Sequence, residues 1–234
     1  MRRFNRGVAW YTEIMYSSRV QYSSYSADPD RPSADEMAAI HRRMNPPVNE
    51  QPVPLPVNLV VARAENVVVA LSGVDVYSVG FAFTLRVRLR TRPVRAHQMH
   101  LLIGGYGGAD TDPEQRLLVG IEFADGRRAS SAVPDPAARA DPQRPLLTGG
   151  GGSGGDVAMD RVNWVTPLPP DGPLLVVVRC GALGVPESTV RLDGGEIARA
   201  AEQVTVLWPP PPPATMQDRR PPRLPSDGWF SRLT

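Results

Sequence analysis

The chain has 234 residues and 41% hydrophobic content, enough for one large apolar core or two small ones. Its formal net charge is only +2, and arginines nearly balance acidic residues over 57–208, which argues against a basic nucleic-acid-binding module. No apolar run approaches the length of a membrane span, and the single cysteine, Cys180, excludes an internal disulfide. These features predict a cytoplasmic protein with no membrane or nucleic-acid partner.

Residues 1–56 are expected to form an N-terminal extension, partly disordered and outside the core. Within it, a short helix is predicted from Ser33 to about Met44, because Ser33 can cap the helix and Glu36 completes a capping box. Closely spaced prolines then favour an extended lead-in, since proline fixes φ and disfavours helix before it: Pro52, Pro54 and Pro56.

The strongest secondary-structure signal is the stretch Val79–Arg92, VGFAFTLRVRLRTR. Apolar residues occupy its odd positions, and its even positions carry small residues followed by arginines. Because successive strand side chains point to opposite faces, this alternation predicts one long antiparallel strand with one buried and one solvated face. A helix would spread the arginines around its whole circumference.

Further short strands surround this one, separated by turn signals and with almost no helix between them. They are expected at Asn58–Arg63, Asn66–Leu71, Gln98–Ile103, Arg116–Phe123, Arg127–Val133, Met159–Val165, Leu174–Cys180, Thr189–Leu192 and Gln203–Trp208. This pattern predicts an all-β fold, an antiparallel β-sandwich of jelly-roll type, as the domain over 57–208. A barrel is the alternative architecture.

Three segments between the predicted strands have sequences typical of a turn, a linker and a short helix. Asp125-Gly126 is typical of a hairpin turn that needs positive φ. Residues 134–155 are predicted to be a long loop ending in GGGGSGG at Gly149–Gly155, a flexible linker by composition. One or two helical turns are expected at Glu196–Glu202.

Several of these segments, taken in order, also suggest a family. They are NVVVALSGVDVYSVGFAFTLRVRLR, GIEFADGRRAS, WVTPLPPDGPL and ALGVPESTVRLDGGEIARAAEQVTVLWP. Over residues 66–208 the chain thereby resembles an uncharacterised family of actinobacterial cytosolic, β-rich proteins. The resemblance implies no activity, cofactor or catalytic residue, and it leaves the N-terminal segment and the tail after Trp208 outside.

The arginine row Arg86, Arg88 and Arg90 is a candidate ligand face. Neighbours two apart on a strand are about 6–7 Å apart, a spacing that could grip a polyanion or an acidic protein surface. The alternative is a solvated sheet face on which carboxylates pair with the arginines across strands. Glu65, Asp75 and Glu122 are the expected partners.

No metal, cofactor or catalytic site is predicted. His97 and His100 would point to opposite faces of a strand, and the acidic loop at Asp110, Asp112 and Glu114 lacks the later ligands of a calcium loop. GGGGSGG lacks the Lys-Ser/Thr that a phosphate-binding loop requires, and no Gly-x-Ser-x-Gly motif surrounds a serine. We expect Cys180 to be a buried, inert thiol.

The tail, residues 209–234, is the most suggestive segment. Pro209–Pro213 is expected to form a polyproline II rod of about 16 Å. After it come an R-x-x-P-x-x-P spacing, which aromatic grooves bind, and an apolar end of the kind that fills interface pockets. The residues predicted to bind a partner are Arg219, Arg220, Pro222, Pro225, Trp229, Phe230 and Leu233. A tail that is disordered or folded back on its own body is the alternative.

The sequence therefore favours a non-catalytic, structural or protein-interacting β-sandwich with the tail as a docking element for a protein partner. Exposed edge strands would also permit a homodimer. A second hypothesis is a jelly-roll domain that binds a small anionic or sugar-like ligand through Arg86, Arg88, Arg90 and Trp164. A third is an enzyme whose residues gather from distant loops, recognisable by a histidine and a carboxylate in its deepest pocket.

Overall fold

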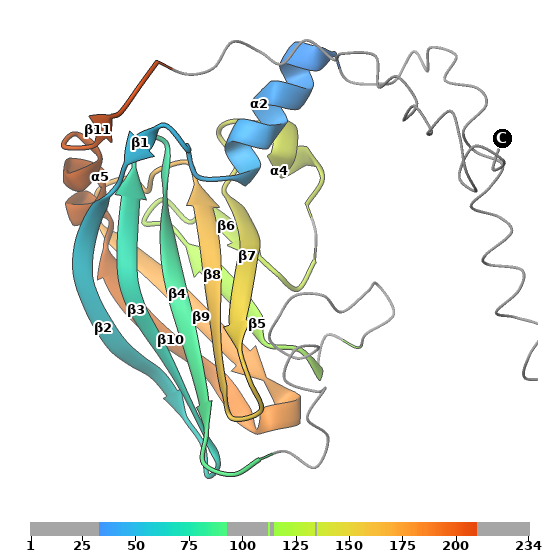
Figure 1. The fold of residues 1–234 in the computed structure, drawn as a ribbon. Helices are drawn as coiled ribbons and strands as arrows, with labels where there is room; N and C mark the ends of the chain where they lie inside the picture. Colours follow the sequence, from blue (N-terminus) through green and yellow to red (C-terminus); the bar gives the residue numbers. More distant parts are fainter. Residues whose placement is uncertain (1–32, 93–111, 113–114, 134, 210–234) are drawn as a thin grey trace, which may run out of the picture. The chain divides into compact units, whose positions relative to one another are not determined.

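The computed structural model describes residues 33–92, 112, 115–133 and 135–209. Over this part the chain is mostly β, with two antiparallel sheets, a two-stranded ribbon and short helices (Figure 1). The β-rich class expected from the sequence is thereby confirmed.

The larger sheet has five strands in the order β2-β3-β4-β8-β7, all antiparallel to their neighbours. Their bounds are β2 Val53–Arg63, β3 Val67–Tyr77, β4 Gly80–Leu89, β8 Ala158–Thr166 and β7 Leu146–Gly154. Consecutive hairpins build β2, β3 and β4, whereas the β4–β8 pairing joins segments far apart in the sequence.

The smaller sheet has four strands in the order β10-β9-β5-β6. Their bounds are β10 Val185–Asp193, β9 Pro173–Cys180, β5 Leu118–Glu122 and β6 Arg128–Ser130. The remaining elements are α2 Ala34–Met44, α4 Ala137–Ala140, η2 Gly181–Leu183, α5 Gly194–Ala201, and the ribbon strands β1 Glu50–Gln51 and β11 Thr205–Val206.

Val79 lies before β4 and is exposed, although the alternation predicted that it faces the core, and Gly80 and Ala82 are buried on the face predicted to be solvated. From Phe83 to Leu89, strand β4 confirms the predicted alternation. Its inward-facing residues are buried, whereas Arg86 and Arg88 between them are exposed: Phe81, Phe83, Leu85, Val87 and Leu89. The Asp125-Gly126 turn is also confirmed, because Gly126 has φ 82° and its amide donates to the carbonyl of Phe123.

The two sheets face each other across one apolar core, to which both contribute residues such as Leu71, Phe83, Val119 and Val176. At the edges β10 lies beside β2, and β6 lies beside β7. The ladder hydrogen bonds that would join the sheets are not among the described strand pairings, so the sheets are not closed into a barrel.

The prediction of a flexible linker at Gly149–Gly155 is wrong for most of that segment. Strand β7 extends to Gly154 and pairs with β8, with Leu146 opposite Thr166 and Ser153 opposite Asp160. Ladder bonds come from the main chain and need no side chains. The absence of a side chain at Gly149 also leaves space for Arg161, whose guanidinium would lie only 2.7 Å from an added Cβ.

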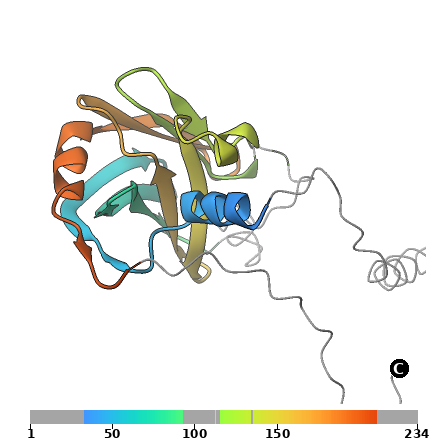
Figure 2. The same cartoon turned by 90° about the horizontal axis from the view of Figure 1, so that it is seen from above.

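The predicted N-terminal helix is confirmed as α2, but this helix packs on the β body. Figure 2 shows it beside α4, and it also contacts β7 and β8. The lead-in predicted as extended is already part of the sheet, because β2 begins at Val53. At the other end, the strand predicted at Gln203–Trp208 is only Thr205–Val206, while the one at Gln98–Ile103 lies outside the described residues.

Candidate functional site

The ribbon of β1 and β11 joins the segment between α2 and β2 to the C-terminal end of the described chain. Glu50 pairs with Val206, the amide of Leu207 donates to the carbonyl of Asn49 at 2.8 Å, and the side-chain amide of Asn49 donates to the carbonyl of Trp208 at 2.9 Å. These bonds fix the chain just before Pro209, where the proline-rich tail begins. The ribbon is therefore the root of the tail.

Large apolar side chains are exposed on and beside this ribbon. We call them the ribbon patch: Val48 (77% exposed), Val79 (46%), Val206 (59%), Leu207 (48%) and Trp208 (52%). Val79 joins the others because the carboxylate of Glu50 accepts hydrogen bonds from the amide and hydroxyl of Ser78, at 2.9 and 2.5 Å. The patch is thus assembled from a segment before β1, the β3–β4 turn and the chain after β11.

The segments that carry these residues are held together by hydrogen bonds, so the residues are less isolated than single apolar residues scattered over a protein surface. Contiguous apolar surface commonly marks a contact with another protein segment, and tryptophan is enriched where such contacts are strongest. A two-stranded ribbon of this length is also only marginally stable by itself. The ribbon patch is therefore the described surface best suited to docking.

The three arginines of the predicted ligand face are exposed, but two of them contact the same carboxylate, that of Asp160. Arg88 contacts Asp160 at 2.5 Å and Arg86 contacts it at 3.7 Å, with Asp160 placed opposite Arg86 on β8. Arg90 follows the end of β4, where its amide donates to the carbonyl of Asn66, and its side chain is exposed. The partner of the first two arginines is thus Asp160, not one of the acids expected from the sequence.

Trp164 lies on the same sheet face but is covered. Its side chain is buried at 2% exposure, its indole Nε1 donates to the carbonyl of Arg43 at 2.8 Å, and its ring meets Tyr77 edge-on at 5.5 Å. The end of α2 thus covers the ring. Burial of Tyr77, with Asp75 and Glu50 nearby, raises the pKa of its phenol.

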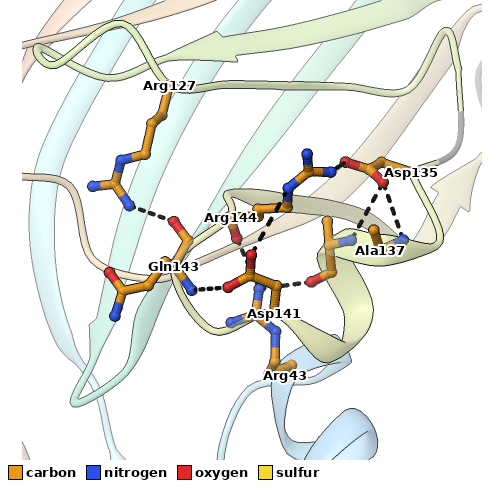
Figure 3. A network of polar contacts seen from close by, with 8 residues as sticks. Arg43, Arg127, Asp135, Ala137, Asp141, Gln143 and Arg144 are labelled. Carbon is orange, nitrogen blue, oxygen red and sulfur yellow. Dashed lines mark hydrogen bonds and ion pairs between the residues drawn. The ribbon is translucent and has the colours of Figure 1, made fainter.

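Figure 3 shows the polar network that holds α2 against the loop around α4. Arg43 donates to the carbonyls of Ala138 and Arg144, both at 2.8 Å. Arg144 in turn binds Asp135 at 2.8 Å and lies 3.8 Å from Asp141. Burial lowers the pKa of Arg43, and the charge of Asp141 opposes that shift. The network uses its charges to anchor a helix.

A shallow hollow of about 810 Å³ lies on the smaller sheet, where Gly120 and Val177 face outward. Two of the acidic side chains that line it are paired: Glu122 with Arg128 at 2.8 Å, and Asp135 with Arg144 at 2.8 Å. Glu187 lines the hollow as well, so its charged lining consists of three carboxylates and Arg128.

Polar residues also project into the space between the sheets. Arg161 is 6% exposed, and burial together with the neighbouring charge of Arg116 lowers the pKa of its guanidinium. Asn163 is fully buried beside them and donates to the carbonyl of Arg161 at 3.2 Å. Because Arg161 and Asn163 are both buried, this group is part of the interior of the body.

The other predicted sites divide between the described and undescribed parts of the chain. Cys180 is confirmed as buried, and burial raises the pKa of its thiol. Asp112 is exposed and described, whereas His97 and His100 lie outside the described residues. The tail residues predicted to bind a partner lie outside them as well: Arg219, Arg220, Pro222, Pro225, Trp229, Phe230 and Leu233. Among the described residues, no three His, Cys, Asp or Glu side chains gather as metal ligands.

Sequence reasoning missed the ribbon patch. The sequence predicts one strand over Gln203–Trp208 and does not predict its exposure, because an apolar run beside a turn has the same composition whether it is buried or exposed. Val48 stands alone among polar residues and prolines, and nothing in the sequence links it to Val79. A weak signal existed in the apolar Val-Leu-Trp run directly before five prolines.

Comparison with known proteins gives no match: no protein-family model, no curated protein and no solved structure is similar to this chain at a significant level. The resemblance to an actinobacterial family therefore stays a prediction. In the part of the chain that the structure describes, no helix is long and apolar enough to cross a membrane.

Proposed function

We propose that this chain is a cytosolic, non-catalytic protein-interaction module that docks a partner protein through the ribbon patch and the tail rooted in it. The observation that carries the proposal is the exposure of Val48, Val79 and Trp208 on three separate segments that hydrogen bonds of Asn49 and Glu50 hold together. Exposed apolar residues at the start of a segment with docking motifs can contact the same partner protein as that segment. The buried, lone Cys180 fits a reducing cytosol.

The body in this proposal is a β-sandwich of jelly-roll type. The shared core of the two facing sheets supports a sandwich, as does the passage of the chain between sheets from β4 to β5, β6 to β7 and β8 to β9. The consecutive β2-β3-β4 hairpins depart from the regular alternation of a jelly roll.

Binding of a small anionic ligand is the less favoured function. Asp160 offsets the charge of Arg86 and Arg88, and Trp164 is enclosed by α2, which removes the stacking surface that a sugar would need. The residues of the ribbon patch, in contrast, are exposed.

The test has two stages. Tagged full-length chain is first used to capture proteins from the native lysate, in parallel with a chain lacking residues 209–234 and with a Val206→Thr, Trp208→Ser variant. The candidate partner is then purified and titrated against the same three proteins. Because the altered patch residues are half exposed, the variants should keep the melting temperature of the wild type.

The expected result is tight binding by the full chain, weakened by the patch variant and lost on tail deletion. Val157→Thr is the matched control, since Val157 is also exposed (38%) but lies at the β7–β8 turn, and it should bind normally. Equal binding by the full and tail-deleted chains contradicts the proposal.

A further inference from the structure

We propose that, in the absence of a partner, the apolar end of the tail docks on the ribbon patch of its own chain. The residues that make this contact are Trp229, Phe230 and Leu233. This inference goes beyond the proposed function, because the tail can cover the patch whether or not a partner protein exists. It gives the patch one specific occupant.

The first argument is where the described chain ends. Trp208 belongs to the patch, and Pro209 begins the tail immediately after it. Residues 210–234 therefore start at the surface that they would cover, and their local concentration there is far higher than that of any second molecule. Their apolar aromatic residues stand at the far end, at Trp229-Phe230.

The second argument is reach. The rod expected for Pro209–Pro213 leads about 16 Å away from the ribbon. A flexible chain between Pro213 and Trp229 has a root-mean-square span of roughly 20–24 Å, which is enough to return over that distance. We expect the prolines of this segment to restrict it only locally, so that the chain can still turn back toward the ribbon.

The third argument is charge and chemistry. Glu50 places a carboxylate beside the patch, because it lies opposite Val206 on the ribbon. The apolar end of the tail carries Arg232 between its aromatic pair and Leu233. An apolar surface with an acidic neighbour thus meets an apolar segment with one cation, and docking removes Trp208 from water.

The experiment places a nitroxide spin label on a cysteine introduced by Ser231→Cys in the full chain. Native Cys180 is fully buried, so the unmodified chain should take up no label and serves as the labelling control. Methyl signals of Val48, Val206 and Leu207 report proximity, because a nearby unpaired electron broadens them. The methyls of Val157 are the internal control, because Val157 lies beside Leu89 at the end of β4, whereas the turn that carries Val79 precedes the start of β4.

We expect loss of the patch methyl signals, with those of Val157 preserved and full recovery when the nitroxide is reduced. Adding Trp229→Ala and Phe230→Ala to the labelled chain should restore the signals. Adding Arg219→Ala and Arg220→Ala should leave them broadened, because those residues precede the docking end. Unbroadened patch methyls in the labelled chain, or broadening that survives the aromatic substitutions, overturn the proposal.

A mixed sample separates the chain's own tail from that of a second copy. Spin-labelled protein without isotope enrichment is combined with methyl-labelled protein that carries no spin label. Preserved patch signals in this sample support docking within one chain, whereas broadening there overturns it in favour of a dimer. No partner protein is present, so the result is independent of the binding titration that tests the proposed function.

Discussion

The indole of Trp164 donates a hydrogen bond to the main-chain carbonyl of Arg43, over 2.8 Å, and so fastens the last turn of α2 to the outer face of the larger sheet. The hydroxyl of Thr148 does the same for the carbonyl of Met44 at 3.1 Å. These carbonyls belong to a helix end, where no intrahelical donor is available. Side chains of the sheet therefore complete the helix.

Trp164→Phe should loosen α2 without disrupting the sheet. Phenylalanine keeps an aromatic ring against Tyr77 but cannot donate to the carbonyl of Arg43, so we expect a loss of about 1 kcal/mol in unfolding free energy. Amide hydrogen exchange should accelerate in α2 and remain slow in β4. Thr148→Val, which removes the neighbouring donor, is the matched variant, and unchanged α2 exchange in both would show that the helix is held by other contacts.

Gly80→Ala should destabilise the fold by about 1–3 kcal/mol. A Cβ at Gly80 would overlap the main-chain carbonyl oxygen of Val165 and the ring of Trp164, neither of which can move freely inside the sheet. The measurement is the urea midpoint of unfolding. Gly151→Ala is the control, because a Cβ at Gly151 meets nothing within 4 Å, and a similar loss in both variants would contradict this packing argument.

Asp160→Asn should have a small effect on stability and a larger one on the charge of the sheet face. The side chain of Asp160 is 32% exposed and those of Arg86 and Arg88 about half exposed, so their ion pairs contribute at most about 1 kcal/mol. Most of that loss should disappear in high salt, because exposed pairs are screened. Thermal melts at low and high salt measure it.

Retention on an immobilised polyanion then tests the arginine face. Asp160→Asn should increase retention, because it removes the carboxylate that offsets Arg86 and Arg88. The control is Asp156→Asn, because Asp156 contacts a single, more exposed arginine, Arg92, at 3.7 Å. Equal retention of wild type and Asp160→Asn would argue against any ligand role for this face.

Cys180 should react with thiol reagents only when the protein opens. Its side chain is fully buried, and burial raises the pKa of the thiol, so little thiolate forms in the folded chain at neutral pH. Labelling rates should follow the fraction unfolded as urea is added. Fast labelling of the native protein at neutral pH would contradict the burial.

Because the pKa of the Cys180 thiol is raised in the folded chain, the free energy of unfolding should depend on pH in the alkaline range. Because the folded thiol has the higher pKa, its favourable contribution is complete below the unfolded thiol pKa and is lost as pH rises through the folded value. The raised pKa of Tyr77 acts in the same direction at higher pH. Urea midpoints should therefore fall above the ordinary cysteine pKa, and Cys180→Ala should remove the lower-pH part of that fall.

The sequence predicted the elements whose pattern is local. Alternation between buried and exposed residues predicted β4, Asp125-Gly126 predicted the hairpin of β5 and β6, and the capping residues predicted α2. Composition failed at Gly149–Gly155, because a glycine run reads as a linker while the main chain of β7 still finds ladder partners in β8. The docking prediction for the tail stays untested, since those residues lie outside the described part of the chain.

By itself, the sequence determined a β-rich body with a near-neutral middle, one buried thiol and a proline-rich end. Only the tertiary structure decided which surfaces meet. It placed Asp160 within reach of Arg86 and Arg88, covered Trp164 with α2, and paired Glu50 with Val206. The physical reason is range: alternation, turns and caps act over a few residues, whereas strand pairing and packing join segments whose separation in the chain carries no periodic signal.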